Sequence, residues 1–198
     1  MILKRIFDLL VSLLGLIILT PLFLLIAGLI KLDSNGPIFF RQARVGRNGD
    51  IFRIHKFRTM VSESDHQGLQ ITVGDDNRIT KMGAFLRKCK IDELPQLVDV
   101  LAGNMSLVGP RPEVPIYIEY YPTKIRQVVL SVRPGITDYA SIKYKDESTI
   151  LGNAEDPHEV YINEILPIKQ NLYIYYVRNQ SFFGDIRIIF KTLINIFH

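Results

Sequence analysis

The sequence predicts an α+β protein that is mainly helical and that starts with a membrane-embedded segment. Two observations predict this class. A 22-residue stretch near the N-terminus carries no charge. Apolar residues then recur at helical spacing through most of the chain, after one short strand–turn–strand pattern. We therefore expect a membrane anchor over residues 1–34 and a second domain over residues 35–198.

The composition agrees with an anchored protein. Mean hydropathy is +0.15 although charged residues make up 22% of the chain, so the apolar excess lies mainly in the N-terminal stretch. The net charge of +4 and the pI of about 9.1 suit an anionic membrane surface or a phosphate-bearing substrate. No nucleic acid is expected as a partner, because no nucleic-acid-binding motif accompanies the basic pI. Cys89 is the single cysteine, which excludes an intrachain disulfide.

The uncharged stretch covers residues 9–30. As a straight helix it would reach roughly 33 Å, about one hydrocarbon thickness. A cleaved signal peptide is disfavoured, because no small-x-small site precedes Lys31. A single transmembrane span is the simplest interpretation.

Two features favour a helix hairpin that enters one leaflet and returns. Pro21 removes a helix hydrogen bond near the middle, and Thr20 before it is biased away from helical angles, so we expect a break there. Lys4 and Arg5 precede the stretch and Lys31 follows it, so both flanks are basic. The positive-inside rule is satisfied only if both ends stay cytoplasmic. These features favour a re-entrant membrane helix hairpin with both ends on the cytoplasmic side. A single span with a proline kink is the alternative, because such kinks also occur in ordinary spans.

The segment after the anchor reads as a small β-hairpin. Residues 38–60 give two short strands, with Gly46 and residues 48–50 supplying the turn. Residues 62–77 are polar and are expected to form a loop, whose Asp75 and Asp76 fit either a metal site or a solvated turn.

The second half is predicted to be helical in several pieces. Asp92 has the position of an N-cap, apolar residues follow it at helical spacing, and Gly103 is a natural stop. The other expected elements are a short helix over residues 78–90, a helix over 113–130 interrupted near Pro122, an extended run over 138–144, and a helix over 156–178 with a break at Pro167.

Near the C-terminus an apolar stripe faces basic and amide side chains, which predicts an amphipathic helix. Core packing and an interfacial position in the membrane explain the pattern equally well. The stripe comprises Ile186, Ile189, Phe190, Leu193, Ile194 and Phe197.

The first candidate for chemistry is the pair Asp92 and Glu93. A carboxylate at a helix start stays ionised and can ligate a hard cation or attack phosphorus. An ordinary N-cap role also explains Asp92, and from the local sequence alone the N-cap is the better interpretation.

The second candidate is a set of basic residues. Arg111 lies between two prolines and Arg133 precedes another, so each guanidinium is presented from a rigid backbone, as bidentate phosphate recognition requires. Lys56 and Arg58 alternate along a strand and would share one face. That face fits a phosphate site or the solvated side of a hairpin.

These features occur together in a recognisable order. The sequence resembles the bacterial sugar transferases, the small monotopic phosphoglycosyl transferases, from residue 4 to about residue 190. Each motif alone is weak or moderate evidence, and their number and order make the resemblance specific. The motifs are Pro21 and residues 4–8 (KRIFD), 56–60 (KFRTM), 76–80 (DNRIT), 86–87 (LR), 92–97 (DELPQL), 105–112 (MSLVGPRP) and 133–137 (RPGIT).

The resemblance implies a function and a site. It implies a monotopic protein on the cytoplasmic face of the inner membrane, held by a re-entrant helix hairpin. Residues 35–198 would form a cytoplasmic catalytic domain that uses Asp92 and Glu93 as a catalytic dyad with Mg²⁺. A sugar 1-phosphate would pass from a UDP-sugar to undecaprenyl phosphate through an aspartyl phosphosugar intermediate. Substrate phosphates would be bound by the basic side chains of the motifs, Arg87, Arg111, Arg133, Lys56 and Arg58.

The sequence departs from the family pattern at one place. Many relatives continue the RPGIT run with Gly-Trp-Ala-Gln, whereas Asp138 and Tyr139 follow it here. The departure puts the donor sugar in doubt, but not the dyad.

The expected partners are a UDP-sugar donor, the undecaprenyl phosphate acceptor and membrane lipids, and a homodimer is left open. The alternative from another class is a membrane-anchored binding or scaffold protein of the same fold without turnover. The pathway expected for an active enzyme is the first membrane step of a surface glycan or glycoconjugate.

Overall fold

A computed structural model describes residues 2–61, 74 and 76–197. The polar loop expected over residues 62–77, together with Asp75, lies mostly outside these described residues.

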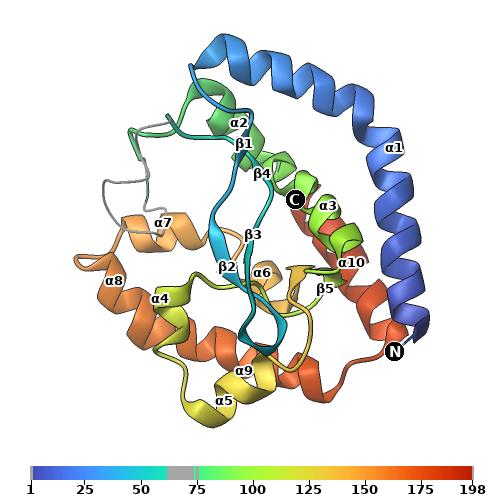
Figure 1. Ribbon diagram of the computed structural model, residues 1–198. Helices are drawn as coiled ribbons and strands as arrows, with labels where there is room; N and C mark the ends of the chain where they lie inside the picture. The colour runs from blue at the N-terminus through green and yellow to red at the C-terminus, as the bar shows by residue number, and fades with distance from the viewer. Residues whose placement is uncertain (1, 62–73, 75, 198) are drawn as a thin grey trace.

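The N-terminal stretch forms one helix, α1 (Ile2–Asp33). Figure 1 shows that α1 bends part-way, so that its two arms follow different edges of the molecule. Pro21 lies inside the helix, and the Thr20 hydroxyl donates to the Leu16 carbonyl at 2.7 Å. The break expected at this position is therefore a bend within a continuous helix. By length and composition α1 can cross a membrane, since its most apolar 18-residue window has a mean hydropathy of 2.8 and is only 11% buried.

Charged groups tie the first turns of α1 to the rest of the protein. The Lys4 amine donates to Asp185 Oδ2 at 2.6 Å and to the Val108 carbonyl at 3.0 Å. Asp8 accepts from the Ser106 hydroxyl at 2.7 Å. Both aspartates are buried. The anchor helix is therefore joined to segments that lie about a hundred residues and more further along the chain.

The predicted strand–turn–strand pattern is confirmed and is extended by a second strand pair. In the turn, Asn48 and Gly49 have φ angles of 59° and 91°, which match the residue types found there. The antiparallel pairs are β1 (Phe39–Phe40) with β4 (Lys56–Phe57), and β2 (Ala43–Val45) with β3 (Ile51–Arg53), around the 3₁₀ turn η1 (Arg47–Gly49).

A third strand pair was not expected. β5 (Ser106–Val108) and β6 (Gly135–Thr137) are parallel neighbours. The two segments approach so closely just after β5 that a Cβ on Gly135 would overlap the backbone of Gly109. The extended run expected over residues 138–144 is also wrong: Asp138 accepts from the Ser141 amide at 2.8 Å and caps helix α6 (Tyr139–Lys143).

The remaining helices largely follow the predicted pattern. Gly103, at φ 89°, ends α3 (Leu97–Ala102), and Pro122 separates α4 (Pro115–Ile118) from α5 (Thr123–Val129). Pro167 does not break its helix: it lies just after a π-helical turn over residues 161–165, which is continuous with the helices on both sides. The other elements are α2 (Lys81–Lys88), the 3₁₀ segment η3 (Ile91–Gln96), α7 (Glu147–Gly152), α8 (Pro157–Val160), the π segment η4 (Tyr161–Ile165), α9 (Leu166–Arg178) and α10 (Phe182–Phe197).

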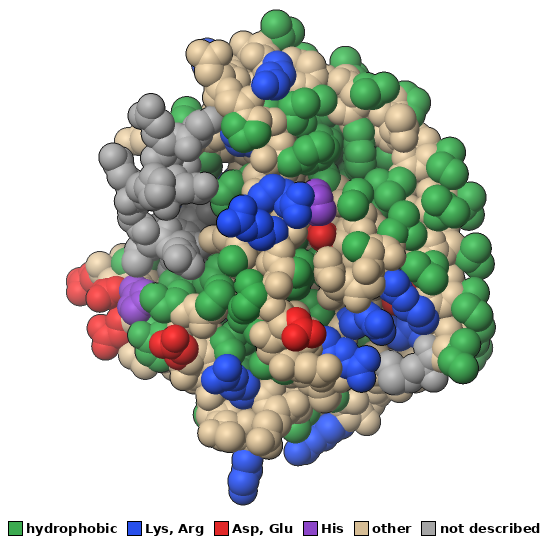
Figure 2. All heavy atoms as spheres, viewed as in Figure 1, with side chains coloured by type: hydrophobic (Ala, Val, Ile, Leu, Met, Phe, Trp, Pro, Cys, Tyr) green, Lys and Arg blue, Asp and Glu red, His purple; other side chains and the backbone are tan. Residues whose placement is uncertain are grey.

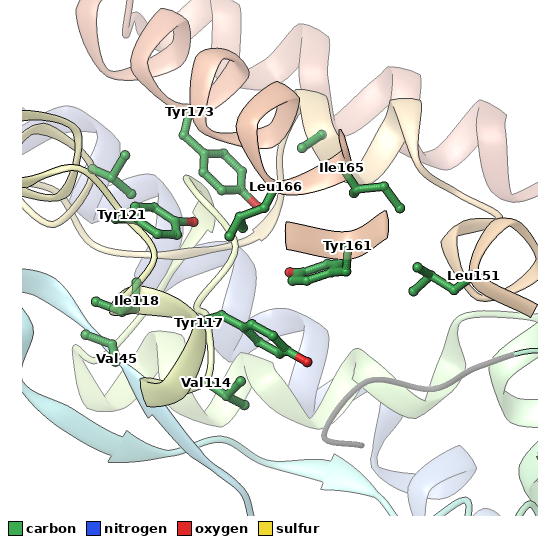
Figure 3. Close-up of a cluster of buried hydrophobic side chains, with 12 residues drawn as sticks. Val45, Val114, Tyr117, Ile118, Tyr121, Leu151, Tyr161, Ile165, Leu166 and Tyr173 are labelled. Carbon is green, nitrogen blue, oxygen red and sulfur yellow. The ribbon is translucent and has the colours of Figure 1, made fainter. Parts of the chain in front are cut away.

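The largest apolar core lies between α4, α5, η4 and α9 and is rich in tyrosine. Figure 3 shows Tyr117, Tyr121, Tyr161 and Tyr173 gathered there with aliphatic side chains. The amphipathic C-terminal helix is confirmed as α10. Ile188 on α10 is buried, whereas its apolar side chains Phe183, Phe190, Leu193 and Ile194 are exposed. One face of α10 therefore packs in the core and leaves another apolar face uncovered.

Candidate active site

The two candidate carboxyl groups lie together in the first turn of η3. This segment follows Lys90, which has a left-handed φ of 55° and takes the N-cap position. The expectation that Asp92 is an N-cap is therefore wrong. The Asp92 carboxylate accepts no hydrogen bond from any residue that the structure describes, although the side chain is only 8% exposed. An ordinary capping role does not account for Asp92.

Glu93 has the opposite environment, because two cations hold it. Lys56 Nζ lies 2.6 Å from Glu93 Oε1, and Arg111 donates one N–H to each carboxylate oxygen, at 3.0 Å for Oε2. Burial alone would raise the pKa of Glu93, but Arg111 and Lys56 hold that pKa well below its usual range. The Glu93 charge raises the pKa of Arg111 in turn. Glu93 is thus an ionised carboxylate with a fixed orientation.

Asp92 is more basic than an ordinary aspartate. Burial raises its pKa, the neighbouring Glu93 charge raises it further, and Lys56 and Arg87 oppose both effects. A carboxylate that is deprotonated but poorly solvated is a stronger nucleophile than one in water. Glu93 is therefore the carboxylate that Lys56 and Arg111 hold in place, and Asp92 is the one that can act as a nucleophile.

Two further arginines surround the pair. Arg87, on α2, donates from Nε to the Thr59 hydroxyl at 2.8 Å, and its charge interacts with Asp92. Arg44, on β2, donates to the Pro112 carbonyl at 3.0 Å. Burial lowers the pKa of Arg44, and the nearby charges of Arg111 and Glu93 act on that pKa in opposite directions. Arg44 was not among the predicted site residues, because nothing in its local sequence separates it from the other basic residues of the hairpin.

The structure does not bring Arg58 and Arg133 to the carboxyl pair. Arg58 is 4% exposed and donates to the carbonyls of Ser34 and Asn35, at 2.7 and 2.6 Å, just after the C-terminal end of α1. Arg133 donates from Nε to the Gly103 carbonyl at 2.8 Å, at the end of α3 away from η3. In these positions both guanidiniums satisfy backbone carbonyls beyond a helix C-terminus.

The carboxyl pair is compatible with a metal ion that is shared with a substrate. Among the described residues there is no cluster of three or more His, Cys, Asp and Glu side chains that could hold a metal alone. Mg²⁺ typically takes one or two carboxylates and completes its shell with water and substrate phosphates. Asp92, whose carboxylate accepts no hydrogen bond from the part of the chain that the structure describes, and the adjacent Glu93 fit that arrangement.

Asp138, at the position of the family departure, lies close to this site. It is 1% exposed, burial raises its pKa, and the charge of Arg111 opposes that rise. Its hydrogen bonds to Ser141 account for the side chain as a helix cap.

The site lies in a domain with a large apolar border. Figure 2 shows hydrophobic side chains gathered along the edge that α1 occupies in Figure 1, with lysine and arginine side chains on the face beside it. On α1, Ile18 is 73% exposed and Leu24 is 70% exposed. A soluble protein does not leave such a continuous apolar surface in water, so this edge indicates membrane association.

Comparisons with known proteins agree with these features. A model described as bacterial sugar transferase matches residues 1–198. The chain is 38% identical, over 96% of its length, to a UDP-N-acetylgalactosamine-undecaprenyl-phosphate N-acetylgalactosaminephosphotransferase of Aeromonas hydrophila, and covers 42% of that protein. It is 40% identical, over 98% of its length, to a UDP-glucose:undecaprenyl-phosphate glucose-1-phosphate transferase of Klebsiella pneumoniae, covering 40% of it. It is also 38% identical, over 96% of its length, to the exopolysaccharide production protein ExoY of Sinorhizobium fredii, covering 83% of it.

Proposed function

The chain belongs to the bacterial sugar transferase family, and on that premise we propose that it transfers a sugar 1-phosphate from a UDP-sugar to undecaprenyl phosphate, with release of UMP. The relatives differ in donor by name, N-acetylgalactosamine in one and glucose in another. The proposal is therefore made for the class of UDP-sugars, as the first membrane step of a glycan pathway.

The observation that carries the proposal is the division of labour in the carboxyl pair. The Asp92 carboxylate has no hydrogen-bond partner within the described part of the chain, whereas Glu93 is held by Lys56 and Arg111. In the first step, an Asp92 oxygen forms a bond to the sugar-linked phosphorus of the donor. The bond from that phosphorus to the bridging oxygen breaks, and UMP leaves with the electron pair.

In the second step, a phosphate oxygen of the lipid attacks the same phosphorus. The bond to Asp92 breaks, and undecaprenyl-diphosphate-sugar leaves. The carboxylate of Asp92 is regenerated, so the two displacements balance. Glu93, as a fixed and ionised carboxylate, orients the groups beside Asp92.

The surrounding cations suit an anionic donor. Lys56, Arg87 and Arg111 place positive charge around the pair, where the donor diphosphate would develop negative charge. Mg²⁺ held by Asp92 and Glu93 would neutralise the leaving UMP. Chelation with EDTA should abolish turnover and added Mg²⁺ should restore it, whereas activity in excess EDTA would remove the metal from the proposal.

The intact mass of the protein after mixing with donor alone tests the covalent step. Wild type should gain the mass of one sugar phosphate and release UMP, and Asp92→Asn should do neither. A protein that releases UMP only when undecaprenyl phosphate is present, and that never gains mass under rapid quench, would favour direct transfer. No turnover with any UDP-sugar would leave the non-catalytic scaffold as the better interpretation.

We propose the matching topology from the same features. The bend in α1 and the basic residues on both of its flanks support a re-entrant anchor over residues 1–34. The catalytic domain over residues 35–198 would then lie on the cytoplasmic face of the inner membrane. The exposed apolar face of α10 would rest in the interface beside it.

A further inference from the structure

Next to the site lies a histidine–aspartate pair that the proposed mechanism does not use. The ring nitrogen Nδ1 of His55 lies 2.7 Å from Asp99 Oδ1, and the backbone N–H of His55 donates to Asp99 Oδ2 at 2.8 Å. One carboxylate thus holds both the ring and the backbone of one residue. The side chain of Asp99 is 1% exposed and that of His55 is 22% exposed.

His55 and Asp99 each lie next to an element that carries a candidate active-site residue. His55 directly precedes Lys56, which begins β4 and bonds to Glu93 at 2.6 Å. Asp99 lies on α3, which continues directly from η3, the segment that carries Glu93. The His55–Asp99 contact and the Lys56–Glu93 contact are therefore neighbouring cross-links between the segment that leads into β4 and the continuous helical run of η3 and α3.

This geometry matters because the position of the Lys56 amine depends on where its backbone lies. Its side chain is a flexible four-carbon stem, and β4 is a strand of two residues that pairs with a strand of two residues. A clamp on the preceding backbone N–H fixes where the Lys56 stem begins. A buried carboxylate that accepts two hydrogen bonds is a rigid clamp.

We propose that His55 and Asp99 are positioning residues that set the β4 backbone so that Lys56 holds Glu93 in its productive orientation. The expected effect on turnover rests on the proposed function, whereas the positioning of Lys56 does not. The carboxylate of Asp99 can only accept, so the pair requires the proton on Nδ1. Asparagine at position 55 can offer an N–H at the place of Nδ1, whereas leucine cannot.

The test compares His55→Leu with His55→Asn. His55→Leu should lower kcat on the order of 10-fold with little change in KM, and His55→Asn should regain most of the loss. In a Lys56→Met background, His55→Leu should add almost nothing, because His55 acts through Lys56. Equal losses in both backgrounds would overturn the proposal.

A second measurement does not depend on activity. The rate at which a water-soluble acetylating reagent modifies Lys56, followed by peptide mass spectrometry, should rise several-fold in His55→Leu and stay near wild type in His55→Asn. An unchanged rate in His55→Leu would refute the positioning role even if no transferase activity were found in any variant. If His55→Leu does not fold, His55→Ala, which removes the ring and its hydrogen bond to Asp99, takes its place in both measurements.

Discussion

Replacing Arg111 by lysine keeps its charge and removes its planar fork, so it isolates the geometry of the Glu93 clamp. Arg111 donates one N–H to each oxygen of Glu93, and their side chains are 28% and 18% exposed. Lysine can keep one of these bonds but not both. One charge-assisted hydrogen bond in such a partly buried pair is worth about 1.5–3 kcal/mol. If this loss is expressed in the transition state, kcat should fall roughly 10- to 150-fold.

The assay is UMP release from a UDP-sugar with undecaprenyl phosphate in detergent, with kcat and KM fitted separately. Arg133→Lys is the matched control. Among the described residues, the Arg133 side chain makes one hydrogen bond, to the Gly103 carbonyl, which a lysine amine can replace, so the kcat of this variant should stay near wild type. Wild-type kcat in Arg111→Lys would refute the clamp. An equal fall in Arg133→Lys would return that residue to the phosphate-binding role first expected for it.

Three further outcomes are expected. Burial raises the pKa of Asp92 in the folded protein, so ionisation of Asp92 opposes folding as the pH rises from its unfolded pKa through its folded pKa. Asp92→Asn should therefore melt higher than wild type at pH 7.5, by about 2–4 °C for each 1 kcal/mol recovered. A lower melting temperature would contradict this. Gly135→Ala should cost more than about 3 kcal/mol and leave little folded protein, because its Cβ meets backbone that cannot move aside; normal yield and melting would contradict the close approach of β5 and β6. In a Cys89→Ser background, Leu3→Cys and Asn35→Cys should both resist an impermeant thiol reagent in intact cells, and labelling of the N-terminal site alone would establish a full transmembrane span.

The elements that sequence could predict depend on local signals. The hairpin turn is encoded by Asn48 and Gly49, the end of α3 by Gly103 and the interruption after α4 by Pro122, each acting within a few residues. The parallel pair β5–β6 joins segments about thirty residues apart and has no local signature, so it was missed. The cap of α6 is different. Asp138 followed by Ser141 is a local capping pattern, and weighing it would have corrected the extended assignment.

The grouping of the candidate site residues could be predicted only in part, because contacts between distant segments decide it. Lys56, Arg87 and Arg111 do gather around Asp92 and Glu93. Arg58 and Arg133 instead bind backbone carbonyls. An arginine that satisfies a carbonyl and one that awaits a phosphate look alike in sequence, because a guanidinium serves both acceptors and only the fold decides which one is near.

The bond between Lys4 and Asp185 has a consequence for how the protein is made. The two residues are 181 positions apart, yet they share a hydrogen bond of 2.6 Å within one buried network. Translation therefore delivers the hydrophobic helix to the membrane long before the acid that pairs with its first turn exists. Until α10 leaves the ribosome, the Lys4 amine must be solvated by water or by lipid phosphates. Final docking of the first turn of α1 accordingly waits until α10 has been synthesised, and a ribosome-bound chain halted before residue 185 should carry an inserted anchor whose Lys4 is not yet paired.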